Sequence, residues 1–167
     1  ARVARGGVAA ASVAEACAPA GAVGVVVMDD AQALEVIGGP HGALAVMRPG
    51  SVVALHSTVT LETIDELGRL AAERGIHFLD AGISGGEHGS RAGTLVTMVG
   101  GDAEAVELAR PVFDAFSREV VHAGPLGAGM AVKLARNAVG YVMMAAAHEA
   151  LLLTDAAGVD PAVLRHV

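Results

Sequence analysis

Lys133 and Asn137 are the residues whose types and spacing most directly suggest chemistry. They lie four apart in a run that is compatible with an α-helix, so they share one helical face. Gly124, Gly127 and Gly129 precede them, and most other neighbours are apolar. Such a lysine is either a structural residue whose apolar stem carries the ammonium to solvent, or a catalytic group tuned by partial burial. Spacing alone favours the structural interpretation and leaves the catalytic one open.

A β-α-β-α-β pattern must position these residues. Apolar runs predict strands at 22–28, 51–55 and 76–80, the first of them buried on both faces. Thr60 caps an amphipathic helix between the last two strands. The short connections indicate a Rossmann-like α/β fold with a doubly wound, mostly parallel sheet. Ligands bind beyond the carboxyl ends of such strands. The candidate ligand-binding segments are therefore residues 28–30, residues 56–58 and the chain from Asp80 onward.

Shorter elements are predicted around this framework. Ser12 and Glu15 have the spacing of a capping box at the start of a short helix. The other predicted elements are helices at 31–37 (capped by Asp30), 41–47 and 102–116, and strands at 94–99 and 119–122.

The last long helix is predicted at 128–157, where it would extend about 45 Å. It is apolar nearly all round, and such a helix must be buried by further protein. We therefore expect an additional helical domain, a partner subunit or both, which predicts a homodimer or a higher homo-oligomer formed through this helix.

Ser84, Gly85 and Gly86 form the most informative loop. Two consecutive backbone N–H groups beside a hydroxyl suit an anion such as a carboxylate. The segment 82–86 also matches the G-x-S-x-G pattern of serine hydrolases, but that pattern needs a helix directly after the serine. The glycines at 85, 86, 89 and 93 oppose a helix, so a hydrolase is disfavoured. The seven histidines show no metal-binding spacing, so we expect no metal.

The bulk composition limits the partners. A formal net charge of -7 without a basic cluster argues against nucleic acid. The single cysteine, Cys17, excludes an internal disulfide and fits a reducing compartment, which predicts a cytoplasmic protein. The apolar run 138–147 is too short to span a bilayer, so no membrane partner is expected.

With these motifs in place, the sequence resembles the β-hydroxyacid dehydrogenase family, which includes 3-hydroxyisobutyrate dehydrogenase and tartronate semialdehyde reductase. Its substrate signature is matched by Asp80, by Ser-Gly-Gly at 84–86, by Gly-Thr-Leu at 93–95 and by Met-Val-Gly-Gly at 98–101. Its catalytic signature, a glycine-rich turn followed by Lys-x-x-x-Asn, is matched from Gly124 to Asn137. The resemblance covers essentially the whole chain.

This resemblance implies an NAD(P)-dependent oxidoreductase that acts on a small β-hydroxyacid or the corresponding semialdehyde. Ser84, Gly85 and Gly86 would bind the substrate carboxylate. Lys133 would be the general acid/base during hydride transfer, with Asn137 orienting the reacting oxygen or the lysine. Met28, Ser57 and Thr58 would contact NAD or NADP. The alternative is a non-catalytic relative that binds a small carboxylate or serves as a dimerisation scaffold.

The chain also departs from the family. Met28-Asp29 stands where Leu-Pro is usual, and Gly82 stands where Pro is common. Related 6-phosphogluconate dehydrogenases have His at the position of Arg136, which argues against a phosphogluconate substrate, and related imine reductases usually lack the lysine.

The family's G-x-G-x-x-G motif, which binds the pyrophosphate of the cofactor, does not occur in the sequence. We therefore expect a family member that is incomplete at both ends. Residues 1–124 would be a partial dinucleotide-binding domain without its first β-α-β unit. Residues 125–167 would be a linker helix and the start of a helical domain, and cofactor affinity would be weak.

Overall fold

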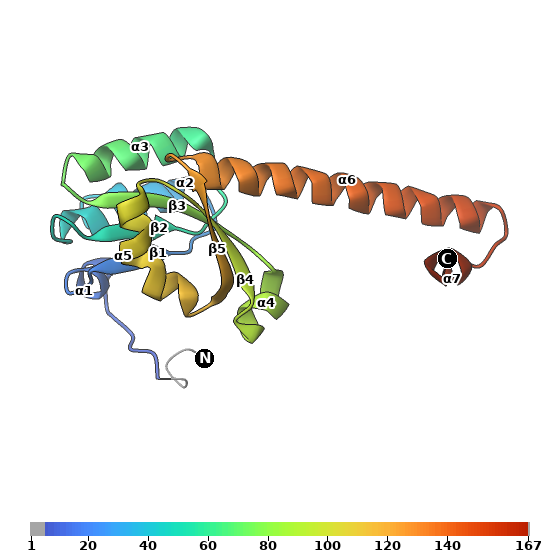
Figure 1. Ribbon diagram of the computed structural model, residues 1–167, viewed down its shortest axis with the longest axis horizontal. Coiled ribbons are helices and arrows are strands. Elements are labelled where there is room, and N and C mark those ends of the chain that lie inside the picture. Colours follow the sequence, from blue (N-terminus) through green and yellow to red (C-terminus); the bar gives the residue numbers. More distant parts are fainter. Residues whose placement is uncertain (1–5, 167) are drawn as a thin grey trace. The chain divides into compact units, whose positions relative to one another are not determined.

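The computed structural model describes residues 6–166, and a five-stranded sheet lies at its centre (Figure 1). Neighbouring strands pair in parallel except for the third and fourth, which are antiparallel. The prediction of a mostly parallel α/β sheet is therefore confirmed. In order across the sheet the strands are β1 (Ala22–Val25), β2 (Val52–Leu55), β3 (His77–Ser84), β4 (Leu95–Gly100) and β5 (Ser117–Gly124).

The alternation of side chains along the strands builds one hydrophobic core on each face of the sheet. On β2, Val53 and Leu55 pack on the face covered by α1 (Val13–Cys17), α2 (Asp30–Ala33) and α3 (Leu61–Ala72). Val52 and Ala54 pack on the opposite face, against α5 (Ala103–Asp114). Figure 1 shows α3 and α5 on either side of the sheet. Each fully buried Val, Leu, Ile or Phe contributes about 1.5–3 kcal/mol, so these two cores hold the strand ends in place.

The predicted helix signals of α1 and α3 are confirmed. Ser12 Oγ accepts from the Glu15 N–H at 3.1 Å, and Thr60 Oγ1 accepts from the Thr63 N–H at 3.3 Å. On α3, the predicted apolar face is buried at Ile64, Leu67 and Ala71, whereas Leu61 is 42% exposed.

The segment around β1 differs from the prediction. The strand ends at Val25 rather than at residue 28, and it is an edge strand with an exposed Gly24, not a strand buried on both faces. Asp29 caps α2 by accepting from the Gln32 N–H at 2.8 Å, because the carboxylate of Asp30 is taken by Thr60. Beyond α2 lie a π-helical turn, η2 (Leu34–Gly38), and a 3₁₀ turn, η3 (Ala43–Ala45), in place of the helix predicted at 41–47.

In the second half of the sheet, several helices and strands begin or end at other residues than predicted. β3 continues to Ser84 because it pairs with the antiparallel β4, in register from Asp80 with Gly100 to Ser84 with Val96. A helix, α4 (Gly86–Ala92), follows at once, although the glycines there predicted none. α5 ends at Asp114, and β5 is longer than predicted because it pairs along the whole of β4.

The chain divides into two compact units, residues 1–133 and residues 134–167. The long helix predicted near 128–157 is present as α6 (Ala128–Ala156), and the division falls within it. A short helix, α7 (Pro161–His166), completes the second unit. The predicted domain boundary at residue 124 stays a prediction.

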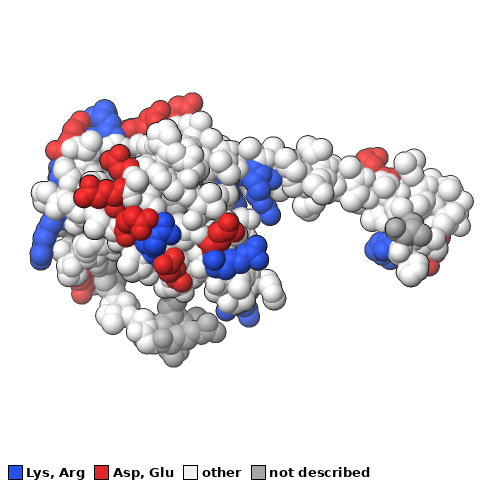
Figure 2. Space-filling view, viewed as in Figure 1, with Lys and Arg blue, Asp and Glu red and all other residues white. Residues whose placement is uncertain are grey.

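The second unit exposes many apolar side chains, including Tyr141, Val142, Met143 and Leu153, each at least 66% exposed. Figure 2 shows this unit mostly white, whereas acidic and basic side chains are intermixed on the visible face of the α/β unit. Within the described residues, no helix has the length and hydropathy that crossing a membrane requires.

Candidate active site at the end of β3

Lys133 lies directly beside the end of β3. Its Nζ donates to the backbone oxygen of Ile83 at 2.6 Å. The lysine stem lies over Gly82, where an added Cβ would come within 2.9 Å of Lys133 Cβ. Since Ile83 is the residue before Ser84, the structure brings the predicted catalytic lysine next to the predicted carboxylate-binding turn.

The turn at Ser84–Gly86 has a backbone conformation that glycine adopts easily. Gly85 has φ 128° and Gly86 has φ 60°, in the region that side chains with a Cβ rarely occupy. Both glycines are exposed, and Ser84 is half-buried. The backbone N–H groups at the start of α4 are therefore open to a ligand beside the Ser84 hydroxyl.

The helix α4 removes one argument against the serine hydrolase pattern, because that argument assumed no helix after Ser84. The strained backbone of a nucleophile elbow is nevertheless missing. Among residues 6–166, positive φ occurs only at glycines, so Ser84 does not have it. Over the same residues, no three His, Cys, Asp or Glu side chains converge to hold a metal ion.

The three predicted cofactor contacts lie at the carboxyl ends of β1 and β2. Ser57 is buried, and its Oγ accepts from the Val27 N–H at 2.7 Å and donates to the Val27 oxygen at 2.8 Å. Ser57 therefore ties the ends of the two strands together. Met28 and Thr58 are exposed at the same edge, Met28 to 85%.

Asn137 follows Lys133 by four residues on α6 and is half-buried. It belongs to the second unit, which begins at Leu134. That the two side chains share one helical face stays a prediction from their spacing.

Asp80, which matches the family's substrate signature, is a buried carboxylate for which the sequence predicted no individual role. It is 0% exposed and lies on β3 three residues before Ile83. Its Oδ1 accepts from the Gly127 N–H at 2.7 Å, and its Oδ2 accepts from the Met130 N–H at 2.5 Å. Burial raises the pKa of Asp80 above its usual range, and these hydrogen bonds oppose that rise. A charged residue inside an apolar strand was the available sequence signal.

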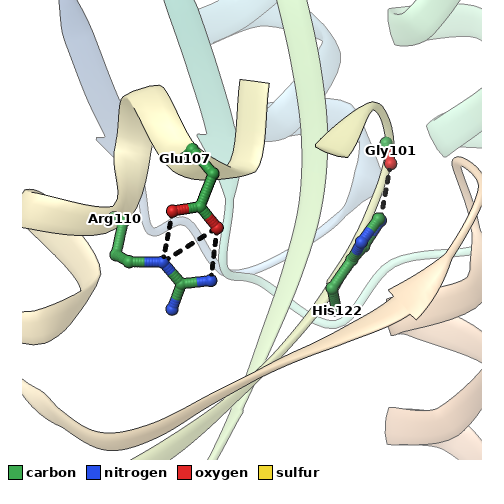
Figure 3. A network of polar contacts seen from close by, with 4 residues as sticks. All are labelled: Gly101, Glu107, Arg110 and His122. Atoms are coloured by element: carbon green, nitrogen blue, oxygen red, sulfur yellow. Dashed lines mark hydrogen bonds and ion pairs between the residues drawn. The ribbon is translucent and has the colours of Figure 1, made fainter. Parts of the chain in front are cut away.

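The ends of β4 and β5 are joined just before α6. His122 Nε2 lies 2.8 Å from the Gly101 oxygen (Figure 3). It also lies 3.0 Å from the Gly124 oxygen, and since both oxygens are acceptors, Nε2–H is the donor. The Gly101 N–H also donates to the Gly124 oxygen at 3.0 Å. These bonds fix the point from which the chain enters the first turn of α6.

A surface pair on α5 completes the polar contacts in Figure 3. Arg110 donates to the Glu107 carboxylate at distances of 2.7–3.0 Å, and these bonds lower the pKa of Glu107. An exposed pair of this kind contributes little to stability.

His56 ends β2 as a buried imidazole. Its Nδ1 lies 2.8 Å from the Ala81 oxygen, and its ring packs edge-on against Phe113 and Phe116. Burial lowers the pKa of His56, and the hydrogen bond to Ala81 opposes this in part. His56 is therefore neutral in the folded protein at pH 7, with Nδ1–H as the donor.

A pH dependence of stability follows from His56. Its folded-state pKa is lowered, so the unfolded chain takes up the proton first as the pH falls below about 6.5. Stability present above that pH is lost on acidification. We expect the midpoint of thermal unfolding to fall between pH 7 and pH 5, and His56→Gln to flatten this slope. His41→Gln, at an exposed histidine, is the control. Equal slopes for all three proteins would exclude His56 as the cause.

A cavity of about 370 Å³ lies at the opposite end of β3, next to its first residues, His77 and Phe78. Gly68 and Ala72 of α3, together with Leu126, form much of its wall. None of the predicted site residues lines this cavity. The candidate site is therefore an open edge of the sheet rather than this hollow.

Comparison with known proteins identifies the family. Residues 1–124 match the NAD binding domain of 6-phosphogluconate dehydrogenase. The chain belongs to this family. An NAD-binding domain of the 6-phosphogluconate dehydrogenase type agrees with the mostly parallel sheet. The predicted cofactor class, NAD or NADP, is confirmed by the family.

The chain is also similar to individual oxidoreductases. It is 40% identical over 162 residues to an uncharacterized oxidoreductase of Mycobacterium tuberculosis H37Rv, covering 97% of this chain and 55% of the relative. It is 44% identical over 126 residues to the NAD-dependent L-serine dehydrogenase of Pseudomonas aeruginosa PAO1, covering 75% and 42%.

The solved structure of Mycobacterium tuberculosis 3-hydroxyisobutyrate dehydrogenase with L-serine matches with a TM-score of 0.82 and 33% identity, covering 90% of this chain and 50% of that one. The predicted resemblance is confirmed. The chain spans about half the length of the relatives it matches.

Proposed function

We propose that the protein is an NAD(P)-dependent oxidoreductase of a small β-hydroxyacid or the corresponding semialdehyde. The observation that carries this proposal is the 2.6 Å hydrogen bond from Lys133 Nζ to Ile83, beside the Ser84–Gly86 turn, in a chain of an NAD-binding family. The bond puts a cationic donor, a hydroxyl and exposed backbone N–H groups within one short stretch of surface.

The turn and the lysine have separate roles in this proposal. Ser84 and the N–H groups of Gly85 and Gly86 bind the substrate carboxylate by hydrogen bonds to an anion. Lys133, in its neutral form, accepts the proton of the substrate hydroxyl as that carbon is oxidised, and in its protonated form returns it in the reverse reaction. Asn137, one helical turn later, orients the reacting oxygen or the lysine.

The residues present fit the nicotinamide end of the cofactor. Met28 and Thr58 are exposed at the strand ends, and Ser57 fixes that edge through its two bonds to Val27. A bound nicotinamide supplies hydride acceptance and donation. The G-x-G-x-x-G that would bind the pyrophosphate does not occur in this sequence.

The substrate class is supported by the relatives, which include an L-serine dehydrogenase and a 3-hydroxyisobutyrate dehydrogenase with L-serine. Both names denote small acids with a hydroxyl on the β-carbon. A turn that binds the carboxylate next to a lysine that exchanges the hydroxyl proton suits this geometry. We further propose a homodimer or higher homo-oligomer, because the second unit exposes a large apolar surface. The cytoplasmic location that the single cysteine predicts is part of the same proposal.

Calorimetric titration separates this function from a carboxylate-binding scaffold. On the 167-residue chain we expect weak binding of NADH and NADPH, because the chain carries no pyrophosphate motif. We also expect L-serine or 3-hydroxyisobutyrate to bind more tightly once cofactor is present.

Two results would count against this account. Micromolar cofactor binding by this chain would contradict the expectation that a chain without the G-x-G-x-x-G motif binds the cofactor weakly. Carboxylate binding that does not depend on cofactor would favour the scaffold.

A further inference from the structure

Asp80 is bound to the first turn of the helix that carries Lys133. A buried carboxylate is costly unless its oxygens accept hydrogen bonds, and those of Asp80 accept from Gly127 and Met130 at 2.7 and 2.5 Å. The first N–H groups of a helix have no partner within the helix, and its dipole favours an anion there. Asp80 therefore caps α6 from a strand that is almost fifty residues away in the sequence.

The packing around this contact leaves little freedom. Met130 is 0% exposed, so the first turn of α6 lies in the core. An added Cβ on Gly100 would overlap the carboxylate oxygen Oδ1 of Asp80. An added Cβ on Gly129 would lie 2.8 Å from the backbone oxygen of Asp80. The helix and the two strands thus meet backbone to backbone, with the carboxylate between them.

Lys133 follows Met130 by three residues, less than one helical turn. The rotation and depth of the first turn therefore decide where the lysine stem lies. In the observed position the stem lies over Gly82, and Nζ reaches Ile83 at 2.6 Å. A misplacement of about 1 Å at a reacting group costs about 10²-fold in rate.

We infer that Asp80 is a positioning residue, which holds Lys133 beside the Ser84–Gly86 turn through the first turn of α6. Its catalytic consequence rests on the proposed function, whereas the positioning itself does not. Asp80 does not act on the substrate, because both of its oxygens are taken by backbone N–H groups.

The test compares Asp80→Asn with Phe113→Leu in the complete protein. Asparagine keeps the size of the side chain but replaces one acceptor oxygen by an NH₂ group, which faces a helix N–H. Phe113 of α5 is fully buried in the core between α5 and the sheet. Phe113→Leu therefore weakens the fold at a position outside α6. In protein labelled with ¹³Cε-lysine, the side-chain NMR signal of Lys133 is the one that disappears in Lys133→Arg.

We expect Asp80→Asn to shift or broaden the Lys133 signal. We also expect kcat to fall by at least about tenfold while KM for the cofactor changes by less than about twofold. Phe113→Leu should lower the unfolding midpoint and leave the signal and kcat as in the wild type. A wild-type signal and kcat in Asp80→Asn would overturn the inference.

If Asp80→Asn does not fold, the wild type still decides the question. A through-hydrogen-bond coupling between the Met130 amide nitrogen and Asp80 Cγ supports the inference, and its absence overturns it. If no hydroxyacid is oxidised by the wild type, the proposed function fails, while the Lys133 signal still reports on positioning.

Discussion

Replacing Lys133 by alanine should reduce kcat for hydroxyacid oxidation by about 10²- to 10⁴-fold, the usual contribution of a general acid/base. Binding of NADH or NADPH should be unchanged, because the cofactor contacts are proposed on the ends of β1 and β2. The loss is expected in kcat rather than in KM for the cofactor, since the lysine exchanges a proton with the substrate alone. Steady-state kinetics of the complete protein measures both quantities.

Arg69→Ala is the matched control for this substitution. It removes one positive charge from the exposed face of α3, where Arg69 pairs with Glu73 at the surface. We expect near-normal turnover from Arg69→Ala. Near-normal turnover from Lys133→Ala would remove the basis for a catalytic lysine and restore the structural interpretation of that residue.

The second large effect is expected at Gly129, in the first turn of α6. An added Cβ there would lie 2.5 Å from the Met98 oxygen, 2.7 Å from the Gly100 nitrogen and 2.8 Å from the Asp80 oxygen. All three are backbone atoms of the sheet, so no side chain can rotate away. Gly129→Ala should lower the free energy of unfolding by about 3 kcal/mol, at the upper end of overpacking effects, and displace Lys133. Denaturant unfolding measures the first effect.

Gly140 offers a control on the same helix. Nothing lies within 4 Å of a Cβ added at this position, and glycine in a helix interior is about 0.8–1 kcal/mol less favourable than alanine. Gly140→Ala should therefore be neutral or stabilising by up to about 1 kcal/mol. If both substitutions had the same small effect, α6 would not be packed directly on the sheet backbone.

Much of this arrangement could be predicted from local patterns. The strand at Val52–Leu55 was predicted within one residue from an apolar run, and the start of the helix at Leu61–Ala72 was predicted from its threonine cap, because both are local signals. The start of α6 was equally clear. The sequence also identified Lys133 and the Ser84 turn as candidates, and the structure places them side by side.

Non-local contacts explain what could not be predicted. Gly85 and Gly89 appeared to exclude a helix, yet α4 begins at Gly86. A Cβ added at Gly85 or Gly89 would lie 3.0 or 3.2 Å from Leu95 Cδ2, so close packing against Leu95 favours glycine at both positions. The pairing of β3 with β4, which extends β3 to Ser84, likewise depends on residues that are far apart in sequence. Gly82, noted only as a departure from the family, is where the Lys133 stem lies.

The central claim is that Lys133 and the Ser84–Gly86 turn act together on one small hydroxyacid. Protein labelled with ¹³Cε-lysine and ¹⁵N-glycine reports on both parts, and the Lys133 signal is assigned by its loss in Lys133→Arg. L-serine and 3-hydroxyisobutyrate can be added in turn with cofactor, and each can be assayed for oxidation.

For an acid that is oxidised, we predict that the Lys133 signal and the amide signals of Gly85 and Gly86 shift together with the same titration midpoint. An acid that is oxidised while the Lys133 signal stays unchanged at saturation would contradict the account.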